Sequence, residues 1–391
     1  MKRILFVDDE PLMLDGLRDL FRKQRREWDM VFAPGGPEGI AALGGAPFDV
    51  IVSDMRMPDA DGNAVLKAAR DRQPAAARVI LSGYAGREAE LAALTVAHQF
   101  LAKPCEPDTL RGIIERACAL PALLASDRLR QLVGGLGRLP SPPKLYWDLT
   151  RATARPEVTM QELAGLVEQD PAMTAKVLQL VNSAVYGSSR HHASVHQALL
   201  YLGTQRLKAL AVTAQVFLAG EASARGLNLE AQQRHAANVA TLAQQFVADP
   251  ARAEVVFTAA LLHEIGTIVL AVSAPDEMKE VSRLCQATGA LPYEVEQDVL
   301  GTTHGEAGAY LLALWGLPLE IVEAAHHHHH PERAPTDIVV AVHAADALLQ
   351  EVAPTPATPR SSRLHVEFLE QTPWAAHLQR WRDLAQDTHP H

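Results

Sequence analysis

Two stretches decide the fold: RILFVDDE at residues 3–10 and DVIVSDMRMPDADG at residues 49–62. In each, a short apolar run ends abruptly in aspartate, as expected of a buried strand that leads into a polar loop. Three further apolar runs lie at residues 29–33, 78–81 and 100–101. Helix-like patterns lie between and after these runs, at residues 12–25, 38–43, 62–72, 87–97 and 108–118. This alternation predicts an α/β domain with a doubly wound, five-stranded parallel sheet.

Polar side chains follow the predicted strands at the points where the strands end. Asp8 and Asp9 follow the first strand and Asp54 ends the third; Ser82 ends the fourth, and Lys103 follows the fifth. The carboxyl ends of parallel strands meet at one edge of the sheet, where ligands bind. Converging carboxylates repel one another and need a cation, and an all-oxygen set of ligands suits Mg²⁺. An adjacent lysine and hydroxyl then suit a phosphoryl group.

This constellation, with Pro58, Gly62, Gly83, Phe100 and Pro104, resembles the receiver domain of two-component response regulators over about residues 2–120. The resemblance implies a flavodoxin-like fold in which Asp54 is the phosphoacceptor. It implies that Mg²⁺ is held by Asp8, Asp9, Asp54 and the backbone carbonyl of Arg56, and that Ser82 and Lys103 bind the phosphoryl oxygens. Phe100 occupies the position of the family's switch aromatic.

Each of these residues also has a purely structural explanation. Asp54 could begin a turn, Ser82 could cap the next helix, and Lys103 could be a solvated surface lysine. Asp8 and Asp9 could be polar residues that simply end a strand. Together these explanations require four coincidences at four strand ends, so the sequence favours the functional interpretation.

The second half of the chain is predicted to be a separate, all-α domain. A Gly- and Pro-rich stretch, GGLGRLPSPP at residues 134–143, predicts a joint, and residues 121–133 before it predict a bridging helix. Beyond the joint, capped helices follow one another: Thr159 and Glu162 fit a capping box, and Asp170 precedes a proline at a first helical position. The predicted fold is therefore multidomain.

Several segments of this region resemble the HDOD domain, a relative of the HD-type metal phosphohydrolases. They are QDPAMTAKVLQLVNSAVYG at 169–187, ALLYLGTQRLKAL at 198–210, LLHEIG at 261–266 and HGEAGAYLLALWGLP at 304–318. We therefore predict a receiver domain at residues 1–120, a helical linker at 121–131, an HDOD domain at 132–351, and a Pro-rich linker with a terminal amphipathic helix at 352–391.

The resemblance to HD phosphohydrolases also suggests a second metal site. Its candidate ligands are His235, His263, Glu264, His304, His326, His327 and Asp346, and imidazole with carboxylate suits Mn, Fe, Ni or Zn. The family's His-Asp pair is His263-Glu264 here, and the longer side chain would change the geometry. The Gly-Tyr-Pro loop of the cyclic di-GMP-cleaving subfamily is missing, because HHHHHPERAP stands there instead. Each histidine could alternatively be a hydrogen-bonded structural residue.

The chain has 17 histidines, and five are consecutive, from His326 to His330. The HD-like pattern predicts that His326 and His327 point inward at a helix end, and that His328–His330 begin an exposed loop. Two alternatives stay open: a fully solvated tract, or adventitious binding of Ni or Zn by exposed imidazoles.

Composition narrows the functional class. The 391 residues carry 36 basic and 46 acidic side chains, a net charge of −10, which disfavours direct binding to nucleic acid. Three cysteines with no zinc-type spacing indicate a reducing cytoplasm. The N-terminus is a poor signal peptide, and the sequence has no stretch of 18 apolar residues, so no membrane span is expected.

Two functions remain. The favoured one is a response regulator, phosphorylated on Asp54 by a sensor histidine kinase, whose non-catalytic HDOD output binds downstream signalling proteins; a homodimer stays open. The alternative is a phosphorylation-gated, metal-dependent phosphohydrolase acting on cyclic dinucleotides or nucleotides.

Overall fold

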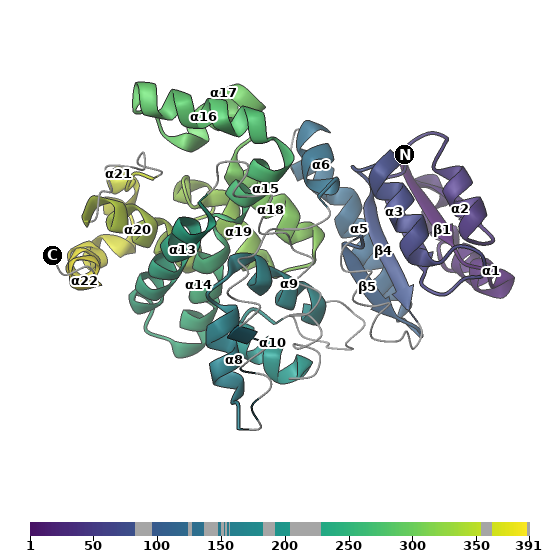
Figure 1. Cartoon of the computed structure of the whole chain (residues 1–391), viewed down its shortest axis with the longest axis horizontal. Helices are drawn as coiled ribbons and strands as arrows, with labels where there is room; N and C mark the ends of the chain where they lie inside the picture. The colour runs from purple at the N-terminus through teal and green to yellow at the C-terminus, as the bar shows by residue number, and fades with distance from the viewer. Residues whose placement is uncertain are drawn as a thin grey trace. The chain divides into compact units, whose positions relative to one another are not determined.

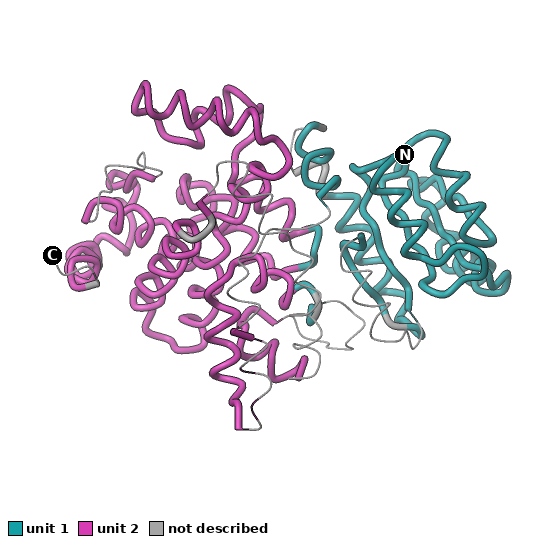
Figure 2. Tube along the Cα trace, in the orientation of Figure 1, with its two compact units in different colours: residues 1–138, 179–191, 314–316 teal, residues 139–178, 192–313, 317–391 magenta. Residues whose placement is uncertain are grey.

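The computed structural model describes residues 1–82, 96–123, 127–136, 148–149, 152, 155, 157–182, 192–203, 228–352 and 362–388. Figure 1 shows its helices and strands. The chain separates into two compact units (Figure 2). The sheet unit comprises residues 1–138, 179–191 and 314–316, and the helical unit comprises residues 139–178, 192–313 and 317–391.

The sheet unit contains the predicted five-stranded parallel sheet. Its strands are β1 (Lys2–Val7), β2 (Trp28–Ala33), β3 (Val50–Asp54), β4 (Ala77–Ser82) and β5 (Gln99–Ala102), in the order β2-β1-β3-β4-β5. The register pairs Val7 with Ser53 and Asp54 with Leu81. The ends of β1, β3 and β4 therefore lie at one edge, and the predicted doubly wound α/β fold is confirmed.

Burial explains why these runs form strands. All five residues of β3 and all six of β4 are buried, which is typical of parallel strands covered on both faces. The core of β1 is extended by Phe6, whose ring stacks on Phe21 and Phe32 at centroid distances of 5.6 and 5.2 Å. The sheet is thus a rigid support for the polar residues at its edge.

The helices of the sheet unit are α1 (Pro11–Leu20), α2 (Gly36–Ala42), α3 (Gly62–Arg72), α5 (Pro107–Leu123) and α6 (Asp127–Gly134), with a 3₁₀ turn at Arg22–Arg26. Asp61 caps α3 by accepting the N–H of Ala64 at 2.9 Å. The helix predicted at residues 87–97 and the predicted joint at 134–143 lie mostly outside the described residues.

The described part of the helical unit contains helices and no strands, as predicted. They are α8 (Met160–Val167), α9 (Pro171–Asn182, whose last residues fall in the sheet unit), α10 (Val195–Leu202), α13 (Leu229–Ala243), α14 (Pro250–Leu262), α15 (Ile265–Ser273), α16 (Pro275–Thr288), α17 (Pro292–Leu300), α18 (His304–Leu314), α19 (Leu319–His327), α20 (Asp337–Val352), α21 (Val366–Glu370) and α22 (Leu378–Thr388). Short 3₁₀ turns lie at Gln244–Phe246, Pro331–Arg333 and Pro373–His377.

The core of the helical unit is formed by α13, α14, α19 and α20, which contact one another. The segment Pro250–Ser273 is long and apolar enough to cross a membrane by length and composition alone. In this fold 78% of its 18-residue apolar window is buried inside the protein, which is the environment of a core helix. The chemistry of the unit therefore depends on which polar residues enter this core.

Candidate functional sites

The edge of the sheet brings Asp8, Asp54 and Lys103 into contact. The ammonium of Lys103 lies 2.7 Å from Oδ2 of Asp8 and also contacts Oδ1 of Asp54. The exposed fractions of Asp8 and Asp54 are 1% and 7%. Two buried carboxylates from different strands therefore share one cation, as their positions at the strand ends predict.

Backbone geometry orients Asp54. Its Oδ2 accepts the N–H of Arg56 at 2.7 Å, which turns the loop after β3 back toward the carboxylate. Gly62 permits this loop to close, since a Cβ there would lie 2.3 Å from the carbonyl oxygen of Asp54. The loop sequence thus supplies the N–H of Arg56 as a donor, and Gly62 leaves the space that the closed loop needs.

Burial and charge set the ionisation of this site. Burial raises the pKa of Asp54, and the neighbouring Lys103 only partly offsets that rise. Burial would lower the pKa of Lys103, but its bonds to Asp54 and Asp8 outweigh burial and raise it. The converging carboxylate oxygens therefore favour positive charge at this site.

The remaining predicted residues lie nearby in the sheet. Asp9 directly follows Asp8 and is partly exposed, while Ser82, at the end of β4, is buried. Lys103 donates its backbone N–H to the carbonyl of Ser82 at 2.7 Å. Phe100 is 3% exposed on β5, so the aromatic at the switch position points into the protein. Gly83 lies outside the described residues.

The donor set fits Mg²⁺. Two buried carboxylates, the partly exposed Asp9 and a backbone carbonyl in the same loop are all hard oxygen donors. A divalent ion bound there would neutralise the repulsion that Asp8 contributes to the raised pKa of Asp54. Asp8, Asp9, Asp54 and the carbonyl of Arg56 are the groups that would hold it.

A second cluster lies inside the helical unit. Histidines and a carboxylate from four segments meet there in two groups that share Glu264, and within each group the ligand atoms lie within 4.8 Å of one another. The groups are His235, His263 and Glu264, and Glu264, His304, His328 and His329. His263, His304 and His328 are at most 1% exposed. Such a concentration of imidazole in a core needs a partner for its nitrogens.

Three of these rings are oriented by hydrogen bonds at Nδ1. His263 Nδ1 lies 2.5 Å from the carbonyl of Ala260, and His328 Nδ1 lies 2.9 Å from that of Ala325. His304 Nδ1 lies 2.7 Å from Oε2 of Glu296. Each acceptor fixes the proton on Nδ1, so the Nε2 lone pair of a neutral ring faces the cluster. This is how proteins orient histidine ligands of metals.

The Nε2 atoms of these rings then lie close to one another. His304 Nε2 is 3.3 Å from His328 Nε2 and 2.9 Å from His329 Nε2. With Nδ1 protonated, His304 and His328 would present lone pairs to each other. A proton or a metal cation between the rings removes this repulsion.

The carboxylates of Glu264 and Asp346 lie at the cluster, and one of their oxygens has no hydrogen-bond partner. Glu264 lies 3.6 Å from His304 and accepts the hydroxyl of Thr267 at 2.5 Å. Asp346 is fully buried; its Oδ1 lies 3.0 Å from His235 Nε2 and 3.9 Å from His263 Nε2, while its Oδ2 has no hydrogen-bond partner. An unpartnered buried carboxylate oxygen is costly, and a cation would satisfy it.

The pKa values of the cluster are strongly shifted by burial and by neighbouring charges. Burial would lower the pKa of His304, but Glu264 and Glu296 outweigh burial and raise it to about 10. Burial raises the pKa of Glu264, but the charge of His304 outweighs this and lowers it to about 2. Burial lowers the pKa of His328 to about 3 and also lowers that of His263. The carboxylates of the metal-free cluster therefore favour the protonated form of His304, and Asp346 outweighs burial to raise the pKa of His235 as well.

One expectation is corrected by the geometry. His326 and His327 do not enter the cluster; the inward rings of the histidine run are His328 and His329. The buried face of α19 and its C-terminal extension is Ile321, Ala324, Ala325 and His328, at spacings i, i+3, i+4 and i+7. His326 and His327 lie off this face, and each is only partly buried. The helical period, applied through the run, would have selected His328.

Three contacting residues were also missed by sequence reasoning. Glu296 is 1% exposed and accepts both the backbone N–H and Nδ1 of His304 at 2.7 Å. His343, fully buried on α20, bonds through Nδ1 to the carbonyl of His328 at 2.7 Å. The ring of Tyr293 stacks on His329 at 4.3 Å. A sequence signal existed for His343, since it lies three residues before Asp346 in an otherwise apolar helix.

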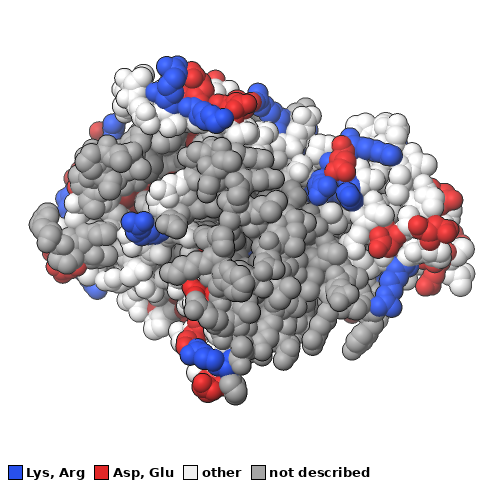
Figure 3. Space-filling view, in the orientation of Figure 1, with Lys and Arg blue, Asp and Glu red and all other residues white. Residues whose placement is uncertain are grey.

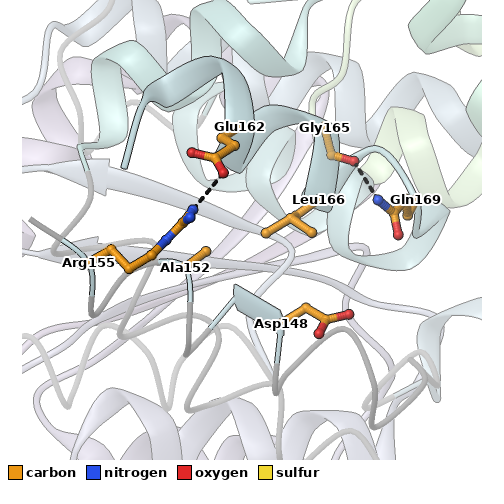
Figure 4. A pocket seen from close by; sticks show the side chains of 7 residues that line it. All are labelled: Asp148, Ala152, Arg155, Glu162, Gly165, Leu166 and Gln169. Carbon is orange, nitrogen blue, oxygen red and sulfur yellow. Dashed lines mark hydrogen bonds and ion pairs between the residues drawn. The ribbon is translucent and has the colours of Figure 1, made fainter. Parts of the chain in front are cut away.

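The helical unit also has an open pocket of about 600 Å³ (Figure 4). It is lined by Asp148, Ala152, Arg155, Glu162, Gly165, Leu166 and Gln169. Arg155 and Glu162 pair with each other at 2.6 Å, and the amide of Gln169 bonds to the carbonyl of Gly165. Its charged groups are thus already satisfied, and it contains none of the cluster residues.

Comparison with known proteins assigns two domains to the chain. The model of the response regulator receiver domain matches residues 4–115, and that of the HDOD domain matches residues 139–331. The hydrogenase transcriptional regulatory protein HoxA of Cupriavidus necator is 34% identical over 116 residues, 29% of this chain and 23% of HoxA. An uncharacterised protein of Treponema pallidum is 23% identical over 206 residues, 51% of this chain and 39% of that protein.

The crystal structure of a virulence factor from Campylobacter jejuni covers 68% of this chain and 98% of its own, at 18% identity and a TM-score of 0.54, which supports the fold. The chain spans about a quarter to two-fifths of the length of the two curated relatives above. The two family models match successive parts of the chain, the first containing the sheet edge and the second most residues of the buried cluster. The chain is a two-component response regulator that joins a receiver domain to an HDOD domain.

Proposed function

We propose that Asp54 accepts a phosphoryl group from a sensor histidine kinase, with Mg²⁺ at Asp8, Asp9, Asp54 and the Arg56 carbonyl. The observation that carries this is Lys103, whose ammonium contacts both Asp8 and Asp54. A carboxylate oxygen of Asp54 forms the new P–O bond, the P–N bond of the kinase's phosphohistidine breaks, and the freed imidazole takes up a proton. Lys103 and Ser82 bind the phosphoryl oxygens.

The test is incubation of the full chain with acetyl phosphate and Mg²⁺, followed by intact-protein mass spectrometry. Wild type gains one phosphoryl mass that is labile to base, and Asp54→Asn gains none. Asp59→Asn is the matched control, because this aspartate lies in the same loop and is exposed. Equal labelling of wild type and Asp54→Asn would show that another residue is the acceptor.

We infer that the buried cluster of the HDOD domain binds a transition metal: Mn, Fe, Ni or Zn. The close Nε2 atoms and the unpartnered Oδ2 of Asp346 support this. His235, His263, Glu264 and Asp346 would hold one ion, and Glu264, His304, His328 and His329 a second. When bound, such a metal could brace the fold or activate a water.

Burial favours the bracing role. Closed sites are typical of structural metals, whereas catalytic metals keep a position open to substrate. Most of the ligands are buried; the His235 side chain is 27% exposed, and His329 is partly exposed. We therefore propose a non-catalytic output that binds a protein partner. On the described part of the face in Figure 3, acidic and basic groups lie beside each other, which supports a protein partner rather than nucleic acid.

The alternative is a metal-dependent phosphohydrolase, which the His, Glu and Asp content of the cluster favours. Tag-free protein should be analysed for metal content, and for turnover of cyclic dinucleotides and bis(p-nitrophenyl) phosphate. We expect bound metal in wild type and His326→Ala, and its loss in His328→Ala. Turnover that His328→Ala abolishes would establish the enzyme instead, and equal metal in all three proteins would exclude the cluster as the site.

The predicted domain limits belong to the same proposal. They are a receiver at 1–120, a linker at 121–131 and an HDOD domain at 132–351. The end of α20 at Val352 supports the last limit, whereas the boundary between the units, at residues 138 and 139, lies seven residues beyond the proposed start of the HDOD domain. The proposed location is the cytoplasm, where a sensor kinase presents its phosphohistidine.

A further inference from the structure

The described C-terminal segment, residues 362–388, is packed onto the HDOD core. We call this segment the strap. It comprises α21, a 3₁₀ turn and α22, and α22 contacts α20 and α13 (Figure 1). Trp381 is 3% exposed and stacks on Phe246 at 4.7 Å, and Leu369 and Ala385 are fully buried. The match to the HDOD model ends at residue 331, so the strap lies beyond it.

A first chain of hydrogen bonds leads from the strap to the cluster. The backbone N–H of Ser362 donates to Oε1 of Gln350 at 3.0 Å. Nε2 of Gln350 donates to Oδ1 of Asp346 at 3.1 Å. Because one end of the amide accepts and the other donates, the strap fixes the orientation of Gln350. That orientation directs an N–H at a cluster carboxylate.

A second chain of hydrogen bonds follows the same logic. The backbone N–H of His365 donates to Nε2 of His343 at 3.0 Å. This bond makes Nε2 an acceptor, so the proton of the neutral ring is on Nδ1. Nδ1 then donates to the carbonyl of His328 at 2.7 Å. The strap thus selects the tautomer of a buried histidine, which in turn holds the backbone of a cluster residue.

We propose that the strap sets the geometry of the buried cluster through these two chains of hydrogen bonds, with Gln350 and His343 as positioning residues. The proposal rests on the metal site inferred above. Without the strap, the bonds from Ser362 to Gln350 and from His365 to His343 are lost, and the strap no longer contributes to fixing the amide orientation or the tautomer. Asp346 and His328 would then be held less firmly. Metal affinity is then controlled by a segment that contributes no ligand.

The experiment uses the full chain and two measurements. Gln350→Ala breaks the first chain of bonds. His343→Gln retains an amide near Nε2 but loses the donor to His328, whereas His343→Asn retains a donor near Nδ1. Gln286→Ala is the matched control, because Gln286 is exposed on α16 and its amide bonds only within that helix.

The first measurement is Co²⁺ affinity, followed by visible absorption. We expect Gln350→Ala and His343→Gln to bind Co²⁺ roughly 10–100-fold more weakly, the usual effect of removing a residue that orients a ligand. His343→Asn should recover most of the affinity. The second measurement is the reaction of metal-free protein with diethylpyrocarbonate, located by mass spectrometry. Modification of His328 should rise by about tenfold or more in the two weakened variants, with the exposed His377 as internal reference.

The two measurements separate the strap from the metal site. If wild type binds no Co²⁺ but His328 becomes reactive in Gln350→Ala, the metal site is wrong and the strap still positions the cluster. If wild type binds Co²⁺ and neither measurement changes in Gln350→Ala or His343→Gln, the strap proposal is overturned and the metal site stands. Equal changes in Gln286→Ala would also overturn it, because the effect would not depend on the strap.

Discussion

The ammonium of Lys103 contacts both Asp8 and Asp54. Replacing Lys103 should therefore slow phosphorylation of the receiver more than replacing an exposed surface lysine. Lys103→Met keeps the length of the side chain but removes the charge that partly offsets the raised pKa of Asp54. We expect phosphorylation by acetyl phosphate to slow by roughly 10²-fold, as for the loss of one charge-stabilising donor. Intact-mass kinetics measure this. Lys67→Met, on the exposed face of α3, is the control and should react at the wild-type rate.

His304 predicts a pH dependence for the second site. Its pKa of about 10 means that the metal-free protein carries a proton on this ring at pH 8, whereas a metal ligand must be deprotonated. Metal binding should therefore displace this proton, and affinity should rise with pH until about pH 10. Calorimetry of Co²⁺ binding in buffers of different ionisation enthalpy measures the release. Glu296→Gln removes a carboxylate that raises this pKa, so it should release less; unchanged release would assign the proton elsewhere.

Residue-level predictability differed between the two sites. Asp8, Asp54 and Lys103 could be placed together because each follows a strand of a parallel sheet, and strand ends share an edge. Glu296 could not be placed in its site, because a buried glutamate on a helix cannot be told from a solvent-exposed one before its packing partner is known. Its position four residues before the buried Leu300 was the available signal.

At the scale of elements, the contact of α15 with α18 predicts a stability effect at Gly266. A Cβ there would lie 1.8 Å from the carbonyl oxygen of His304 and 2.6 Å from the backbone N of Gly308. Gly266→Ala must push the two helices apart, and we expect it to lower the free energy of unfolding by about 1–3 kcal/mol. Urea unfolding followed by circular dichroism measures this.

The matched control for that variant is Gly165→Ala. Gly165 lies inside α8, and nothing lies within 4 Å of an added Cβ. The substitution should therefore stabilise α8 by roughly 0.5–1 kcal/mol, the usual helix preference of alanine over glycine. If both alanines had the same effect, close helix contact would not be what requires Gly266.

Element boundaries followed from sequence wherever a period or a cap was clear. The five strands were identified from short apolar runs, and the predicted caps Thr159 and Asp170 accept backbone N–H groups at the starts of α8 and α9. The error in the histidine run came from treating a helix end as the end of the helical face. His328 stands one residue beyond α19, yet still follows its period.

At the scale of the whole molecule, a response regulator must connect its two sites energetically. If phosphorylation of Asp54 changes the helical unit, it must change the affinity of that unit for any ligand that distinguishes its states. By linkage, bound metal would bias phosphorylation through the same free energy. The metal site therefore offers a direct measure of signalling that requires no knowledge of the downstream partner.

We expect the Co²⁺ affinity of the full chain to differ between its unphosphorylated form and its form held with beryllium fluoride and Mg²⁺, a phosphoryl mimic. A coupling free energy of about 1–3 kcal/mol corresponds to a 5–150-fold change. Absorption titrations of both forms give this factor, and Asp54→Ala should show none of it. The sign of the coupling free energy shows whether phosphorylation strengthens or weakens metal binding by the output domain. A factor of one in wild type, with both ligands bound, would mean that the signal leaves the receiver without passing through the cluster, and the partner surface should then be sought on the receiver itself.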